Sequence, residues 1–247
     1  MFGKFAGFGF DQEGRPLAER VAVELQKAID FGMGLPIEGR TAGWLLFRWH
    51  SGAKQAQGWT RAVEGYLRFR VRSGTRCLEV AGAWERLKEM IGVNLVEAGL
   101  TSRSPEFPVF ALGKGASIPC ADGRMARWEW LNLSTGHWVK PNAYTHSLDH
   151  TLVGEQPIHW DLATLAAEDP GFWEEHGRRL LSMLREEEGV EIDEMAFNWW
   201  RLGYLALRIG QCTFCAGASS GRRQEAQQKA LTAYKSRAAT LLAQLSG

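Results

Sequence analysis

Residues 121–142, ADGRMARWEWLNLSTGHWVKPN, carry the most informative pattern of turns and strands in the chain. Asp122 stands before a glycine in a short turn, and residues 125–133 have the apolar and aromatic pattern of a strand. Residues 134–136, Ser-Thr-Gly, predict a tight turn, after which residues 137–139 predict the returning strand. The stretch therefore predicts a hairpin that begins shortly after a loop aspartate.

The rest of the chain is predominantly helical in its apolar spacing. This spacing, with Gly or Pro at the breaks, predicts helices over residues 16–31, 59–70, 83–98, 160–167, 172–187, 193–216 and 224–245. Alternating small and aromatic residues predict a strand at 2–10, and a second strand is expected at 43–49.

This order of elements predicts an α+β fold of two unequal lobes. Residues 1–52 are expected to form a small strand–helix–strand lobe, and residues 53–247 a larger helical lobe. The hairpin and its flanking loops, residues 118–160, belong to the larger lobe, where we expect the chemistry.

Composition excludes several classes of protein. The 247 residues are 45% hydrophobic and 23% charged, which is typical of a globular chain. Because 29 Lys and Arg residues nearly cancel 28 Asp and Glu residues, we expect no nucleic-acid partner and no anionic membrane partner. The four cysteines are too few for a secreted disulfide framework, and no basic and apolar leader follows Met1, so we expect a cytoplasmic protein.

The hairpin stretch and the segments after it resemble a known family. Residues 121–131, 136–142, 146–150 (HSLDH) and 157–163 (PIHWDLA) follow one another as the catalytic segments of aminoglycoside/choline phosphotransferases do, with a protein-kinase-like fold. The match lies in layout more than in identities. Over roughly residues 40–245 the chain is similar to an uncharacterised bacterial branch of that family.

The resemblance implies an ATP-dependent phosphotransferase that acts on a small hydroxyl-bearing molecule and uses magnesium. Asp122 matches the loop aspartate that accepts the proton of the attacking hydroxyl. Asn142, twenty positions later, falls where the family places its magnesium aspartate. An amide holds a hard cation more weakly than a carboxylate does, and Asp149 is expected to supply the missing charge.

The resemblance also implies a phosphate-binding pair in an abbreviated N-terminal lobe. Lys4 lies on the first predicted strand, and Glu24 lies beside the apolar stripe of the following helix. Kinases pair a strand lysine with a helix glutamate to hold the ATP phosphates. We therefore expect Lys4 and Glu24 to bind the cofactor.

Three alternatives stay open. Asn142 and the short front lobe also fit a catalytically inactive kinase-like protein that binds a small molecule or a protein partner. A rival alignment makes Asp149 the catalytic or metal residue and Asp161 the magnesium ligand, whereas the preferred alignment has Asp161 cap a helix and brace the catalytic loop. A metal centre is the third, either at the pair Cys212 and Cys215 or at His146, Asp149 and His150 with Asp161 or His159.

Overall fold

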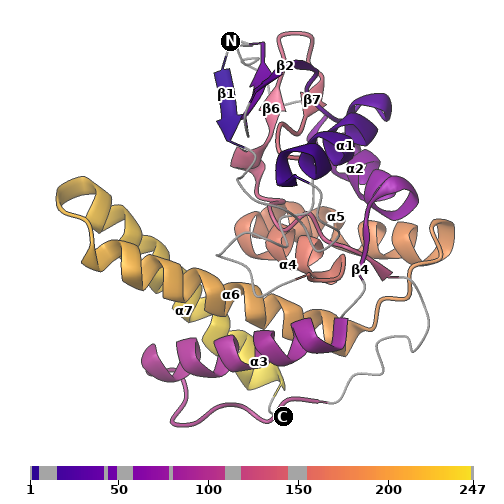
Figure 1. The fold of residues 1–247 in the computed structure, drawn as a ribbon. Coiled ribbons are helices and arrows are strands. Elements are labelled where there is room, and N and C mark those ends of the chain that lie inside the picture. The colour runs from indigo at the N-terminus through magenta and orange to yellow at the C-terminus, as the bar shows by residue number, and fades with distance from the viewer. Residues whose placement is uncertain are drawn as a thin grey trace.

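A computed structural model describes residues 2–5, 16–41, 44–48, 58–77, 80–108, 118–143 and 155–245 (Figure 1). Long helices make up most of the described chain, and three small sheets accompany them. The expected α+β class is confirmed in this general form.

The N-terminal part is an antiparallel sheet of three short strands packed on one helix. The strands are β1 (Phe2–Phe5), β2 (Ile37–Thr41) and β3 (Trp44–Phe47), in the order β1-β3-β2. Helix α1 (Leu17–Asp30) packs against β3 through fully buried side chains that include Leu25 and Phe47. The sequence did not predict β2, because a glycine and two charged residues interrupt its five positions and a bulge lies between Ile37 and Gly39.

The hairpin is shorter than predicted. It pairs β6 (Leu131–Asn132) with β7 (Trp138–Val139), and Gly136 takes the positive φ of 78° that the turn requires. Met125 and Ala126 are consecutive and both buried, whereas consecutive side chains of a strand with one buried face alternate between buried and exposed. Residues Arg127–Glu129 form a 3₁₀ turn, η1.

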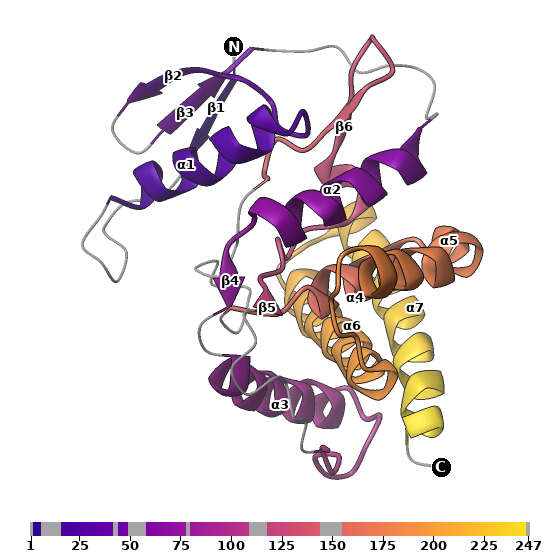
Figure 2. The same cartoon turned by 90° about the vertical axis from the view of Figure 1, so that its right-hand side faces the viewer.

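The hairpin also joins the N-terminal layer to the helices. The Lys140 amide donates to the Met33 carbonyl at 2.8 Å, and Gly34 forms a parallel bridge with Lys140. The segment that follows α1 is thereby tied to the end of β7, and Figure 2 shows the hairpin rising beside α1 and α2.

The helices predicted in the second half of the chain are all present. After α2 (Trp59–Ser73), a short strand β4 (Arg76–Cys77) pairs with β5 (Ile118–Pro119), and α3 (Val80–Glu97) lies between them in sequence. The remaining elements are α4 (His159–Glu168), α5 (Pro170–Ser182), a π-helical turn η2 (Met183–Glu187), α6 (Glu194–Gly217) and α7 (Gly221–Leu245).

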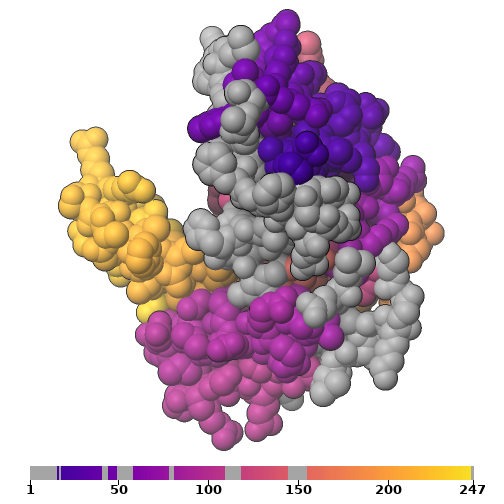
Figure 3. Space-filling view, viewed as in Figure 1, coloured from indigo at the N-terminus to yellow at the C-terminus, as the bar shows by residue number. Residues whose placement is uncertain are grey.

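Helix α6 is the centre of this helical body. It packs along α7 and also against α3 and α4, and the fully buried Trp200 lies on it (Figure 1). Its start is fixed by Asp193, whose carboxylate accepts the Ala196 amide at 2.6 Å. The far end of the α6–α7 pair projects away from the rest of the molecule, as Figure 3 shows. No helix within the described ranges has the length and apolar character needed to cross a membrane.

Leu87 tests how far α3 belongs to the common core. Its side chain is fully buried and faces Gly203 of α6, whereas Val93 on the same helix is 50% exposed. Leu87→Ala should lower the free energy of unfolding by about 2–5 kcal/mol, measured by urea denaturation. Val93→Ala, the matched control, should change it by less than about 0.5 kcal/mol. Equal effects of the two substitutions would mean that α3 is not packed on α6.

Candidate functional site

The loop that carries Asp122 is held by helix α4. The amides of Asp122 and Gly123 each donate to one carboxylate oxygen of Asp161, both at 2.8 Å. Asp161 lies in the first turn of α4, and Ile158 occupies the N-cap position without a side-chain cap. The expectation that Asp161 braces the loop is confirmed, and the expectation that it caps the helix is wrong because its oxygens are turned to the loop.

The carboxylate of Asp122 has no exposed surface. Both oxygens lie close to the Lys140 ammonium, at 3.1 Å for Oδ1 and 3.0 Å for Oδ2. Oδ1 also accepts the Arg124 amide at 3.1 Å, and Oδ2 accepts the Tyr66 hydroxyl in a short hydrogen bond. Each oxygen therefore has two donors from the protein, which is the arrangement a buried carboxylate needs.

Lys140 is also fully buried, and the sequence analysis did not identify it. Its ammonium lies 5.6 Å from the centre of the Tyr66 ring and 5.9 Å from that of Trp130. Charged residues are rarely fully buried unless they are paired, and the sequence around Lys140 gave no signal of its partner Asp122.

Arg70 adds a second buried cation behind the loop. It lies on α2 with 1% of its surface exposed, and its guanidinium donates to the Cys120 carbonyl from Nε at 3.3 Å and from Nη2 at 2.8 Å. Burial alone would lower its pKa, but the nearby Tyr66, Asp122 and Asp161 outweigh burial and raise the pKa of Arg70 above its usual range. Burial also raises the pKa of Tyr66 well above its ordinary value, and the Asp122 carboxylate raises it further.

Asp161 is a carboxyl group of this network whose pKa is strongly raised. Burial, and then the charge of Asp122, raise its pKa from 3.8 to about 7, although Arg70 and the two loop amides act in the opposite direction. The network thus pairs two buried cations with two buried carboxyl groups, one of which takes up a proton near neutral pH.

The structure brings Asn142 to the same loop, but through its backbone. The Lys140 ammonium lies 3.5 Å from the Asn142 carbonyl, whereas the Asn142 side-chain amide donates to Glu129 at 3.2 Å. The amide is turned toward Glu129, and its role as a metal ligand stays a prediction.

The other predicted site residues lie farther from this network or outside the described chain. Lys4 is on β1 opposite Leu45, and its side chain is outside the described part. Glu24 is buried on α1, where the Arg20 Nε donates to it at 3.4 Å, and its pairing with Lys4 stays a prediction. Asp149, with His146 and His150, falls in residues 144–154, which the structure does not describe.

The other predicted metal ligands that the structure describes lie on α4 and α6, and the site expected at His146, Asp149 and His150 stays a prediction because these residues lie outside the described ranges. His159 is buried against Trp200 with ring centres 5.3 Å apart, and burial lowers its pKa to about 4, against the opposing charge of Asp193. Within the described ranges, Cys212 and Cys215 meet no third metal-ligating side chain.

A cavity of about 220 Å³ lies beside the loop. Its lining comes from the loop, from the 3₁₀ turn η1 and the residue before it, and from α4 and α6. The residues that line it are Gly123, Arg124, Ala126, Trp128, Glu129, Thr164, Tyr204, Leu207, Arg208 and Gln211. Neither Asp122 nor Asn142 reaches this cavity.

Comparison with known proteins finds a distant structural likeness and no sequence match. No protein-family profile matches the chain, and no curated protein sequence matches it. Among solved structures, it is similar to a choline/ethanolamine kinase family protein from Mesorhizobium loti, with a TM-score of 0.48 and 13% sequence identity. The similarity covers 91% of this chain and 85% of that one. A likeness of this degree assigns no activity, which has to follow from the side chains themselves.

The buried pair of Asp122 and Lys140 predicts a large, mutually dependent effect on stability. Asp122→Asn leaves the ammonium buried without a countercharge and should lower the free energy of unfolding by about 3–5 kcal/mol. Lys140→Met should cost a similar amount, and the double variant should recover much of the loss because no charge is then left unpaired. Urea denaturation of all four proteins measures the coupling energy. Strictly additive losses would show that the two side chains do not interact.

The raised pKa of Asp161 predicts a pH dependence of stability. Between about pH 4 and pH 7 the folded chain holds a proton on Asp161 that the unfolded chain has released. This contribution is complete below about pH 4 and is lost as the pH rises through 7. The free energy of unfolding of the wild type, relative to Asp161→Asn, should therefore be higher at about pH 5 than at about pH 8 in urea titrations. A difference that stays constant over that range would contradict the raised pKa.

Proposed function

We propose that this chain is a kinase-like binding protein in which Asp122 is a structural anchor and does not act as the base of phosphate transfer. The observation that carries the proposal is the contact of 3.0 Å between Asp122 and Lys140, two side chains with no exposed surface. A general base has to lie within hydrogen-bond reach of the substrate hydroxyl. A buried carboxylate with both oxygens already bonded has no place for that hydroxyl.

Lys140 also places a positive charge beside Asp122, as a metal ion would. In phosphoryl transfer, magnesium neutralises charge beside the catalytic loop. Here an ammonium supplied by the chain itself lies against Asp122 and near the Asn142 carbonyl. The replacement of the expected magnesium aspartate by Asn142 fits this arrangement, because a second carboxylate is not needed when no divalent cation is held there.

The cavity beside the loop is the site we propose for the ligand. It is smaller than the range of roughly 300–1,000 Å³ typical of pockets for drug-sized molecules, so its occupant would be a small polar molecule, not a nucleotide. Arg124 and Arg208 give the lining positive charge, and Glu129 gives it a carboxylate. A ligand there would contact Gly123 and Arg124, and through them the loop that Lys140 and Asp161 hold in place.

Phosphate transfer to a small hydroxyl-bearing molecule is the second candidate. It is favoured by the two hydrogen bonds from the loop amides to Asp161, which hold the loop as the family resemblance requires. In this proposal ATP and magnesium would displace Lys140 from Asp122. Lys4, paired with Glu24, would then hold the phosphates, and Asn142 and Asp149 would hold the metal.

The thermal shift and the ADP release measured with magnesium-ATP separate the two candidates. At about 100 times its dissociation constant, a ligand stabilises the folded state by about 2.7 kcal/mol. As a binding protein without transferase activity, the chain should release no ADP above the level of the double variant Asp122→Asn/Lys140→Met, with a panel of amino alcohols and sugars as acceptors. The double variant is the matched control because it lacks the Asp122 carboxylate and leaves no charged group buried without a partner.

A thermal shift with magnesium-ATP, together with acceptor-dependent ADP release that the double variant lacks, would overturn the binding proposal. That result would establish phosphate transfer in its place.

A further inference from the structure

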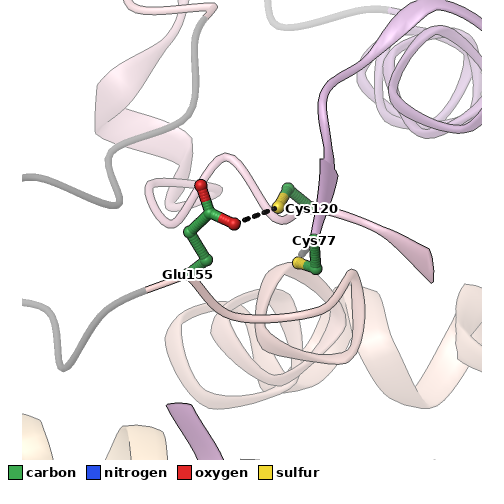
Figure 4. Close-up of side chains that lie close together, drawn as sticks. All are labelled: Cys77, Cys120 and Glu155. Atoms are coloured by element: carbon green, nitrogen blue, oxygen red, sulfur yellow. Dashed lines mark hydrogen bonds between the residues drawn. The ribbon is translucent and has the colours of Figure 1, made fainter. Parts of the chain in front are cut away.

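Two cysteines and a glutamate meet close to the start of the Asp122 loop. The Sγ atoms of Cys77 and Cys120 and a carboxylate oxygen of Glu155 all lie within 4.8 Å of one another (Figure 4). Both thiols are buried, Cys77 at 8% exposure and Cys120 at 0%. These residues are distant in sequence, and sequence spacing gave no signal for the cluster.

Strand pairing explains why they meet. Cys77 on β4 lies opposite Ile118 on β5, and the Cys120 amide continues the ladder by donating to the Thr75 carbonyl at 2.8 Å. Residues two apart on a strand share a face, so Cys120 lies diagonally across from Cys77. An isolated bridge between Cys120 and Pro157 then brings the segment that begins at Glu155 alongside.

We propose that Cys77, Cys120 and Glu155 bind a thiophilic divalent metal ion, with zinc as the expected occupant and water in the fourth position. The distance from Cys120 Sγ to Glu155 Oε2 is 3.8 Å. Zinc–sulfur bonds of about 2.3 Å and zinc–oxygen bonds of about 2.1 Å at a tetrahedral angle separate the two ligands by about 3.6 Å. The donors therefore need to move little.

The hydrogen bonds around the cluster show where the metal would replace protons. Cys120 Sγ donates to Glu155, and Cys77 Sγ donates to the Gln156 carbonyl at 3.3 Å. Contact with Cys77, and then burial, raise the pKa of the Cys120 thiol. One Zn²⁺ binds two thiolates and one carboxylate and releases two protons, which leaves a site of net charge −1.

The surroundings suit that charge. Arg20 Nη2 lies 3.8 Å from Oε1 of Glu155, which leaves Oε2 directed to Cys120. Arg70, through its bonds to the Cys120 carbonyl, brings a second cation near the thiol. Outer groups of this kind orient metal ligands and balance their charge.

Such a metal would have a structural consequence for the site. Cys120 is two residues from Asp122, and Cys77 follows the helix that carries Tyr66 and Arg70. Zinc would connect β4, the Asp122 loop and the segment leading into α4. The site does not depend on the proposed function, because the metal would hold the loop in place whether or not Asp122 is catalytic.

Cobalt(II) is the spectroscopic probe. The full chain, reduced and stripped with a chelator, should bind one equivalent with a thiolate-to-cobalt charge-transfer band and the intense visible bands of tetrahedral coordination, and zinc should displace it. Cys77→Ser and Cys120→Ser should remove the charge-transfer band or weaken it strongly, and Glu155→Gln should lower the affinity at least about tenfold. Cys215→Ser, on α6, is the matched control and should bind as the wild type does.

A second measurement needs no variant and so does not depend on how well the serine variants fold. Zinc should slow alkylation of Cys77 and Cys120 in the wild-type chain, followed residue by residue by mass spectrometry, and should leave Cys215 unaffected. The proposal is overturned if cobalt gives no thiolate band with the reduced wild type, if the band survives in both serine variants, or if zinc protects neither cysteine. It is also overturned if Cys77 and Cys120 form a disulfide that persists in the chain prepared under reducing conditions.

Discussion

Lys140 extends from the end of the hairpin into the helical body and meets Asp122 where neither side chain touches solvent. A buried pair of this kind is weak evidence of net stability, because desolvation costs about as much as the attraction returns. Its effect is on geometry. The loss of either partner would leave a charge buried alone. The hairpin, the loop and Tyr66 on α2 must therefore keep their relative positions. The contact links the hairpin, which is bonded through the Lys140 amide to the Met33 carbonyl after α1, to the Asp122 loop.

The loop is held by hydrogen bonds from several elements of the fold. Asp161 accepts its two amides from α4, Arg70 binds the Cys120 carbonyl from α2, and β4 pairs with the strand just before it. The adjoining cavity is lined by Gly123 and Arg124 of the loop, and Asp122 is not among its lining residues. Rigid support of a loop is equally useful for catalysis and for recognition. The fully bonded state of the Asp122 carboxylate is what favours recognition.

The sequence predicted the helices well and the site only in part. Apolar periodicity located α1 to α7 within a few residues, because each of these helices buries a continuous stripe. The strand β2 and the 3₁₀ turn at Arg127–Glu129 were not predicted, because local preference does not determine them. Pairing with β3 determines β2, and the burial of both Met125 and Ala126 accompanies the turn. The loop position of Asp122 and its brace Asp161 were found from motif layout. Lys140, Arg70 and Cys120 were missed because burial of a charge, or the meeting of distant thiols, is set by tertiary contacts that spacing does not record.

A crystal structure of the chain grown with magnesium and a non-hydrolysable ATP analogue tests the central claim most directly. If Asp122 is an anchor, its carboxylate will remain against the Lys140 ammonium at about the present 3.0 Å, with Tyr66 still bonded to it. A magnesium ion bound beside Asp122 and Asn142, with Lys140 displaced and phosphate oxygens in its place, would contradict the account and restore Asp122 as a catalytic base.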